Sequence, residues 1–333
     1  MVKRQTRKKI TGALGEGFYG IAYNSRSNTL YDQFKEDRIQ SIRLQTLNAK
    51  DEQVINDEAG INDFLHFLKT QNDIIVKTYK TTYLLTGTRH KDNYRTEIQE
   101  NRKIIGLYGP EAKNYLTIYP ISGFRDLDIL GAVFTLRRRR TVYMLFGHRC
   151  NNHYDMKPTK MVKDLLKSLV VLQKSKYLHN DIKLENIVLC GSTYKLIDWG
   201  QAGGYHQFHM GDMIGTSPIK WYMMGYPNVF TDNIMALRTQ MVNSSFKFSE
   251  LFRLVHDQVQ AEYHEVIGSG ISYTELVKRY VPSFDVFMVG MLLLRAIHKF
   301  HLNQRIYLPI VKKLVSLKEP LDAKAALAAV NKM

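Results

Sequence analysis

Cysteine is nearly absent from this chain. Cys150 and Cys190 are the only two among 333 residues, which excludes the disulfide framework on which small secreted domains depend. Such scarcity fits a reducing compartment. We therefore expect an intracellular protein, either cytoplasmic or nuclear.

Long apolar runs are also missing. The longest, "VFMVGMLLL" at residues 286–294, is about half as long as the stretch of about 18 residues that crosses a bilayer. We expect a core helix there and no membrane span. The basic start, "MVKRQTRKKI", has no apolar segment after it, which argues against a secretory signal.

Basic residues outnumber acidic residues in this chain. The chain has 47 Lys and Arg against 31 Asp and Glu, a net charge of +16, which should attract acidic partners. The charge is concentrated in an N-terminal arm, residues 1–10, and in the block 137–140. Both runs are also typical of solvated segments. Neither has the interleaved aromatic residues of a single-strand binding platform, so nucleic acid is a minor alternative.

The first organised stretch is "TGALGEGFYGIAY", residues 11–23. Gly15, Gly17 and Gly20 have the spacing G-x-G-x-x-G between two strand-like segments, and Ala22 follows on the second. A glycine-rich turn lets backbone N–H groups approach phosphate oxygens. Because no helix follows the third glycine, a dinucleotide-binding fingerprint does not fit. A structural hairpin turn remains an alternative.

The first 120 residues favour a small, strand-rich unit with one helix. Apolar residues recur at helical spacing in "DEAGINDFLHFL", and Glu58 lies near the start of that helix. Strand-like segments follow at 73–85 and 114–123, with a polar stretch between them. The remainder, 121–333, is mostly helical, so we expect an α+β fold.

One helical stretch runs directly into "YLHNDIKLENIVL", residues 177–189. This segment places Asp181, Lys183 and Asn186 between two apolar runs. A short hairpin follows, with Asp198 at its exit. These groups can bind metal, phosphate or a proton, so the segment is the strongest candidate for chemistry.

Several motifs together resemble eukaryotic-type protein kinases. "HNDIKLEN" is similar to the catalytic loop H-R-D-x-K-x-x-N, and "DWG" looks like the metal-binding D-F-G. "GTSPIKW", at 215–221, resembles the start of the substrate-binding segment, and "SFDVFMVGMLLL" resembles the helix that carries D-x-W-x-x-G. The resemblance implies a bilobal fold, with a β-rich N-lobe at 11–120 and a helical C-lobe at 121–333.

The Lys in "DIK" resembles the serine/threonine branch of the family. "LIDWGQAGGYH" is also similar to the casein-kinase-two family, although only locally. Together with the charge, this implies protein substrates with acidic surfaces.

The resemblance also implies residue roles. Asp181 would orient the substrate hydroxyl and accept its proton, while Lys183 would contact the transferred phosphate of ATP. Asn186 and Asp198 would hold Mg²⁺, with Mn²⁺ as an alternative. The three glycines and Ala22 would cover the nucleotide. Tyr119 and Ile121, in "YLTIYPISG", would lie in the segment that holds adenine.

The chain departs from the family pattern in four places. Asn180 replaces the Arg before the catalytic Asp, no A-P-E motif is visible, and residues 228–282 are a helical insertion. No clean V-A-I-K follows the glycine loop, so we assign the strand cation to Arg43, paired with Glu58, with Lys35 as its rival. Such divergence resembles kinases of large DNA viruses, whose location would be the host cell or the virion.

Three functions are consistent with the sequence. The first is an ATP-dependent serine/threonine protein kinase. The second is a kinase-fold scaffold without transfer activity, a pseudokinase, which the degraded strand motif suggests. The third is a phosphotransferase that acts on a small molecule in a cleft reshaped by the insertion.

Overall fold

The chain forms two compact units, Met1–Cys150 and Asn151–Met333. The computed structural model describes residues 13–16, 20–28, 31–32, 38–71, 73–79, 89–137, 141–148, 150, 156–207, 250–270 and 272–332. Several predicted features therefore lie outside the described residues. They are the basic arm 1–10, Gly17, Lys35, residues 138–140, "GTSPIKW", and the part of the insertion at 228–249.

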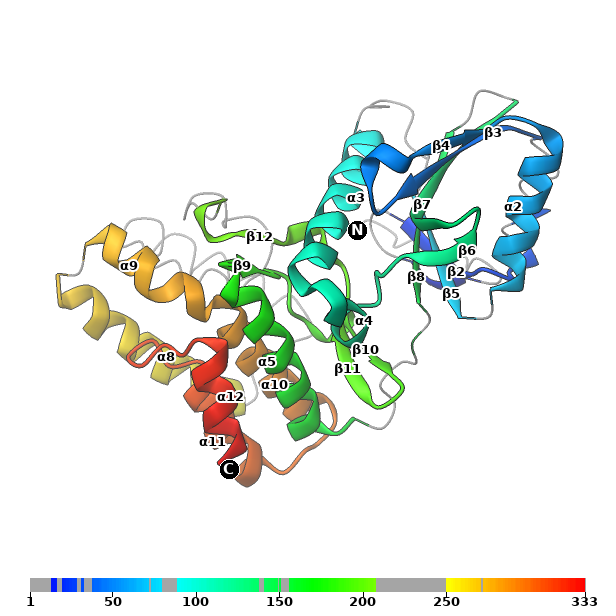
Figure 1. Ribbon diagram of the computed structural model, residues 1–333. Coiled ribbons are helices and arrows are strands. Elements are labelled where there is room, and N and C mark those ends of the chain that lie inside the picture. The colour runs from blue at the N-terminus through cyan, green and yellow to red at the C-terminus, as the bar shows by residue number, and fades with distance from the viewer. Residues whose placement is uncertain are drawn as a thin grey trace, which may run out of the picture. The chain divides into compact units, whose positions relative to one another are not determined.

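Unit 1 is built on an antiparallel sheet of eight strands (Figure 1). The strands are β1 (Ala13–Glu16), β2 (Gly20–Asn24), β3 (Ile39–Thr46), β4 (Gln53–Ile55), β5 (Ile74–Tyr79), β6 (Ile121–Phe124), β7 (Leu127–Leu136) and β8 (Thr141–His148). Their order is β1-β2-β5-β8-β7-β3-β4, and β6 pairs with β7. Thus β2 and β5 are neighbours in the sheet although residues 25–73 separate them in sequence.

Two long helices cover opposite faces of this sheet (Figure 1). Helix α2 (Glu58–Thr70) begins at Asp57, whose side chain accepts from the Gly60 N–H, a common N-cap arrangement. Phe64 of α2 is fully buried and packs against Phe134 and Phe146. The other face carries α3 (Arg89–Tyr108), which is followed by the short α4 (Ala112–Tyr115).

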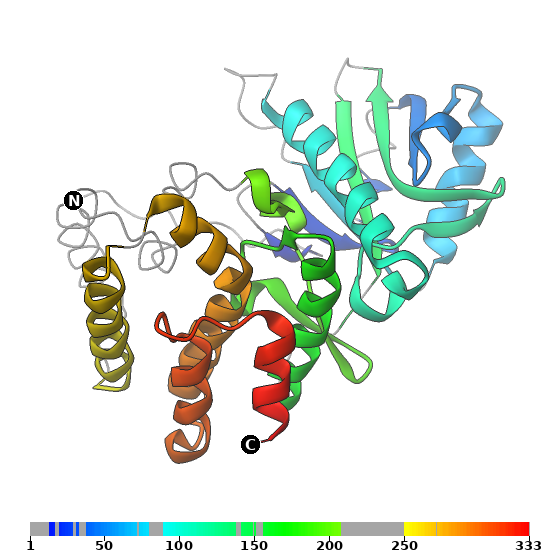
Figure 2. The same cartoon turned by 60° about the vertical axis from the view of Figure 1, so that its left-hand side comes forward.

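Unit 2 is mainly helical. Its helices are α5 (Pro158–Lys174), α8 (Glu250–Gly268), α9 (Tyr273–Tyr280), α10 (Phe284–Lys299), α11 (Gln304–Leu314) and α12 (Ala323–Asn331). Helix α5 packs against α10 and α12, and α10 packs against α11 (Figures 1 and 2). Helices α8 and α9 form the described part of the predicted insertion.

Two short antiparallel strand pairs complete unit 2. Strand β9 (Tyr177–Leu178) pairs with β12 (Gly203–Gly204), and β10 (Ile187–Cys190) pairs with β11 (Thr193–Leu196). The segment between β9 and β10, residues 179–186, contains the predicted Asp181, Lys183 and Asn186.

One stretch of the described residues, Lys278–Lys299, is long and apolar enough to cross a membrane. Within the protein, however, 89% of its apolar window is buried. It includes α10, whose Val286, Val289 and Leu293 are fully buried. The burial is that of a core helix.

The α+β class is confirmed, with an antiparallel sheet in the N-terminal region and helices in the C-terminal region. The division between units lies after Cys150, whereas the sequence analysis placed it after residue 120. The difference arises because β7 pairs with β3, and β8 pairs with β5, so residues 121–148 belong to the sheet of unit 1.

Candidate functional site

The loop "HNDIKLEN", residues 179–186, is held in place by a carboxylate from α10. Asp285 accepts the backbone N–H of His179 at 2.7 Å and that of Asn180 at 2.9 Å. Asp285 is fully buried, and hydrogen bonds to an ionised acceptor are stronger than neutral ones. A residue 105 positions away in sequence therefore fixes the start of the loop.

Asp181, Lys183 and Asn186 lie together in this loop, as the sequence predicted. Asp181 Oδ2 accepts from Lys183 Nζ at 2.6 Å and from Asn186 Nδ2 at 2.9 Å. Asn186 Nδ2 also donates to the Asp181 carbonyl oxygen at 2.9 Å. The carboxylate is thus oriented by two donors while 13% of its side chain stays exposed.

Asn186 and Asp198 have the character of magnesium ligands. Both amide hydrogens of Asn186 are used by Asp181, so its Oδ1 is the atom left for a cation. Asp198 is exposed, and the Ile197 N–H bond to Asn186 O, at 2.9 Å, ties the hairpin exit to the loop. The described residues contain no group of three or more His, Cys, Asp or Glu that could hold a metal. Two oxygen ligands completed by phosphates and water still suit Mg²⁺.

His179 is a structural part of the loop. It is fully buried, with its ring edge-on to Trp199 at 4.5 Å. The Asp181 N–H donates to Nδ1 at 3.3 Å, so the ring proton lies on Nε2, which is 3.2 Å from the Ile197 carbonyl oxygen. Burial lowers the pKa of His179 to about 4, although the nearby carboxylates of Asp181 and Asp198 oppose that shift.

Asn180 and Asp198 both adopt left-handed backbone conformations, with φ of 63° and 64°. Asn and Asp enter this region more readily than other non-glycine residues. Asn180 Nδ2 donates to the Gln201 carbonyl oxygen at 3.3 Å. This uncharged side chain links the loop to the turn after Asp198.

In unit 1 the glycine-rich stretch forms the hairpin of β1 and β2. Gly15 lies opposite Ala22 in the register, and Gly20 is the first residue of β2. A register shift falls between Ala13 and Gly15, as in a β-bulge. The expected strand pair is therefore present, and Gly17 lies outside the described residues.

A lysine and a glutamate outside the predicted site residues form an ion pair beside this hairpin. Lys77 Nζ on β5 donates to Glu97 of α3, at 2.7 Å to Oε1 and 2.8 Å to Oε2. The Tyr79 hydroxyl also donates to Glu97 Oε2. The side chains of Lys77 and Glu97 are 30% and 14% exposed, so the pair is partly screened from solvent.

Lys77 shares a face of the sheet with the hairpin residues. Ala22 is paired with both Gly15 and Lys77 in the register of the strands. Directly opposed residues of antiparallel strands project to the same side. Gly15, Ala22 and Lys77 thus form a row on the face that α3 covers.

The expected pair of Arg43 and Glu58 is not formed. Arg43 is exposed on β3, which β5, β8 and β7 separate from β2 in the sheet. Glu58 is exposed at the start of α2, on the face opposite to α3. No hydrogen bond or ion pair joins these two described side chains. Lys35, the rival candidate, lies outside the described residues.

Tyr119 and Ile121 lie in a different environment from the expected one. Two further strands, β7 and β8, follow them before unit 1 ends. Tyr119 stacks on His148, with ring centroids 3.4 Å apart. Ile121 on β6 is only 3% exposed and belongs to the sheet core. Its side chain is therefore used for packing.

The missed residues had signals in the sequence. "IIVK", at 74–77, is similar to the V-A-I-K pattern. The polar segment 89–108 has buried residues at helical spacing, namely Tyr94, Ile98, Ile104, Ile105 and Tyr108. The role of Asp285 could have been sought in "SFDVF", which resembles the family's D-x-W-x-x-G helix.

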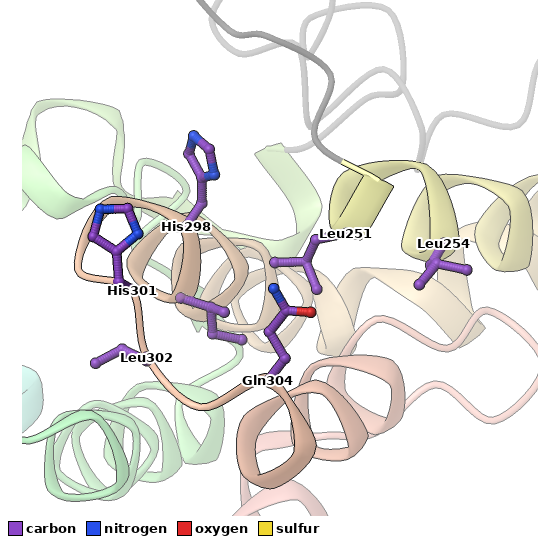
Figure 3. Close-up of a pocket in the computed structure, with 7 residues that line it drawn as sticks. Leu251, Leu254, His298, His301, Leu302 and Gln304 are labelled. Atoms are coloured by element: carbon purple, nitrogen blue, oxygen red, sulfur yellow. The ribbon is translucent and has the colours of Figure 1, made fainter.

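A hollow of about 510 Å³ in unit 2 lies apart from these residues (Figure 3). It is bounded by the start of α8, the end of α10 and the start of α11. Its lining consists of Leu251, Leu254, Ile297, His298, His301, Leu302 and Gln304. The described residues that line it include no carboxylate and none of the predicted site residues, so it is not part of the candidate site.

The chain matches no protein-family model and no curated protein.

Proposed function

We propose that this protein is an ATP-dependent kinase that transfers the γ-phosphate to serine or threonine hydroxyls of protein substrates, including substrates with acidic surfaces. The observation that carries the proposal is the Asp181 carboxylate, held by Lys183 and Asn186 in a loop that Asp285 anchors. Phosphoryl transfer requires little covalent help from the protein beyond such positioning.

The proposed step uses the chain's own groups at stated atoms. The substrate hydroxyl oxygen attacks the γ-phosphorus of ATP, and its proton passes to a carboxylate oxygen of Asp181. The bond from the γ-phosphorus to the bridging oxygen breaks, and ADP leaves with that electron pair. The Lys183 ammonium, next to Asp181, offsets negative charge that develops on the phosphoryl oxygens.

Lys77 supports an active enzyme over an inactive scaffold. The scaffold alternative rested on the apparent lack of a strand lysine. In the resembled family that lysine contacts phosphates of ATP and pairs with a glutamate of the next helix. Lys77 and Glu97 have that chemistry, and Lys77 lies opposite Ala22 in the strand register. We assign the cation role to Lys77 in place of Arg43 or Lys35.

Asn186 and Asp198 would hold Mg²⁺, or Mn²⁺ in its place. When bound, the cation neutralises phosphate charge. The exposed carboxylate of Asp198 and the amide oxygen of Asn186 fit a hard cation.

The proposal extends to the fold. Unit 1 would be the N-lobe of a kinase-like protein and unit 2 its C-lobe. Connections between neighbouring antiparallel strands are usually short. Residues 25–73, between β2 and β5, are therefore an insertion that supplies β3, β4 and α2.

The test is a transfer assay with labelled ATP, Mg²⁺, and separate pools of acidic, basic and neutral peptides that contain serine, threonine or tyrosine. The Asp181→Asn variant should lose roughly 10²- to 10⁴-fold in turnover, as expected for a general base. Its ATP affinity should be nearly unchanged, as measured by calorimetry. Asp63→Asn, an exposed acid of α2, is the matched control and should behave as wild type.

The outcomes separate the three functions. Transfer to serine or threonine peptides that Asp181→Asn abolishes supports the proposal. Nucleotide binding with no transfer to any peptide pool favours the scaffold. Transfer only to small hydroxyl compounds favours the third function. Full turnover in Asp181→Asn would remove Asp181 from the reaction.

A further inference from the structure

The insertion between β2 and β5 contacts helix α3 at one specific place. The β3–β4 corner, defined as residues 46–52, contains the last residue of β3, a single helical turn and Glu52. Arg102 of α3 donates from Nε to the Thr46 carbonyl oxygen at 2.8 Å. It also donates from its Nη2 to Glu52 Oε1 at 2.9 Å. The Arg102 guanidinium therefore forms hydrogen bonds with two acceptors of the inserted segment.

The corner is itself well fixed, so it can serve as an anchor. The Thr46 hydroxyl donates to the Asn48 carbonyl oxygen. The Asn48 side chain accepts from the Lys50 N–H and donates to Asp51 Oδ2. The Leu47 N–H donates to the Asp128 carbonyl oxygen at 2.8 Å, which ties the corner to β7. Thr46 is only 1% exposed.

Helix α3 is thus fastened at two separate places. Glu97 binds Lys77 and Tyr79 on β5, and Arg102 binds the corner. At about 100° per residue, these two side chains project about 140° apart around the helix axis. In the sheet, β8 and β7 lie between β5 and β3. A helix held on one side can roll about that contact, whereas contacts in two directions oppose rolling.

Aromatic packing of Tyr94 of α3 against the sheet also opposes rolling of the helix. Tyr94 is 2% exposed and lies between Tyr79 and Tyr143, with ring centroids at 5.5 and 5.1 Å. It also lies against the glycine backbone at Gly131, where an added Cβ would be 2.9 Å from Tyr94 Oη. The helix therefore sits closely on the sheet at this point.

We propose that Arg102 and Tyr79 are positioning residues, and that the β3–β4 corner is an internal clamp that holds α3 so that Glu97 stays on Lys77. In the resembled family, the position of this helix controls activity. The chain would supply that control from its own insertion. It would therefore be active without a partner or a modification that moves the helix. The link to activity rests on the proposed kinase function, whereas the clamp on α3 does not.

Hydrogen exchange of the α3 amides tests the clamp without any assay of activity. Arg102→Gln and Glu52→Gln, which remove the donor and one acceptor, should each increase exchange in α3 by about fivefold, as expected for loss of a charged hydrogen bond of about 1 kcal/mol. Arg102→Lys keeps the charge without the planar fork, so it should restore only part of the protection. Lys103→Gln is the matched control, because its ion pair with Glu100 stays within the helix and its loss should leave exchange unchanged.

Kinetics then test the positioning role. Arg102→Gln and Tyr79→Phe should lower kcat about fivefold with little change in the KM for ATP, because the fraction of molecules with Lys77 in place falls. In the Arg102→Gln, Glu52→Gln double variant the losses should not add. If Arg102→Gln proves unstable, Glu52→Gln still decides the question.

The outcomes are distinguishable. Equal exchange in α3 for wild type, Arg102→Gln and Glu52→Gln would overturn the clamp, whatever the activity. Faster exchange without any change in kcat would overturn the positioning role. If the wild-type protein transfers no phosphate, the proposed function fails, while the exchange measurement still decides whether the corner holds α3.

Discussion

The two units build their candidate residues in different ways. In unit 2, Asp181, Lys183 and Asn186 lie within six residues of one loop, and one buried carboxylate, that of Asp285, fixes the loop from outside. In unit 1, Lys77 and Glu97 come from a strand and a helix 20 residues apart, and their meeting depends on how α3 is docked. The loop therefore depends on its own neighbouring residues and on one distant anchor, whereas the ion pair depends on how α3 packs on the sheet.

The largest expected effect comes from removing the Asp285 carboxylate, which anchors the loop. Asp285→Ala leaves the buried N–H groups of His179 and Asn180 without this acceptor, at a cost of about 4 kcal/mol in the free energy of unfolding. Urea denaturation measures the loss. Asp322→Ala is the control, since this exposed carboxylate caps α12 through the Ala325 N–H and should cost only about 1 kcal/mol. Similar costs for the two variants would mean that the loop does not depend on Asp285.

The next prediction concerns the cation of unit 1. Lys77→Ala should lower kcat/KM by about 10²-fold, the scale of a lost group that stabilises transition-state charge. Arg43→Ala should have little effect, because Arg43 is exposed on β3. Circular dichroism should show both variants folded. The reverse order would return the role to Arg43.

The third prediction uses the buried imidazole of the loop. His179 has a pKa of about 4 in the folded protein against an ordinary 6.5, so the unfolded chain binds more protons between those values. Stability is therefore complete above the unfolded pKa and is lost as the pH falls toward the folded one. We expect a loss on the order of 2 kcal/mol between about pH 7 and about pH 5.

Urea denaturation at the two pH values checks this. His179→Asn should be less stable than wild type but should have a smaller dependence on pH, whereas His298→Gln, an exposed control, should match wild type. An unchanged pH slope in His179→Asn would assign the acid sensitivity to other groups.

The smallest expected effect tests the close packing around Gly131 of β7. An added Cβ at Gly131 would collide with the Met144 carbonyl oxygen and crowd Tyr94, so Gly131→Ala should cost about 1.5 kcal/mol through overpacking. At Gly147, a Cβ would lie 3.4 Å from its nearest neighbour, the Thr117 carbonyl oxygen, so Gly147→Ala should cost less. Thermal unfolding compares the two. Equal costs would show that the surroundings of Gly131, chiefly the Met144 backbone, can accommodate the added methyl group.

The loop residues were predictable because their spacing is local. Asp181, Lys183, Asn186 and Asp198 follow a contiguous pattern, and the structure brings the first three together. The α+β class followed from apolar periodicity in each segment. Neither inference required knowledge of which strands pair.

The ion pair of Lys77 and Glu97 was not predictable by the same reasoning. Directly after the glycine-rich stretch, the chain offers a strand with Arg43 and a helix with Glu58, which fit the same sequence pattern. Only the pairing of β2 with β5 identifies Lys77 as the neighbour of Ala22, and strand pairing is a non-local property. Helix α3 was not predicted because most of its residues are polar, so its apolar periodicity is weak.

The anchoring of the loop by Asp285 also bears on how such a chain can change in evolution. Asp285 of α10 binds the backbone of His179 and Asn180 directly, so this contact sets the position of the start of the loop. Doubling the length of a flexible connection costs only about 0.6 kcal/mol in closure entropy. The connecting segment can therefore lengthen, acquire helices such as α8 and α9, and diverge in sequence while the loop keeps its geometry.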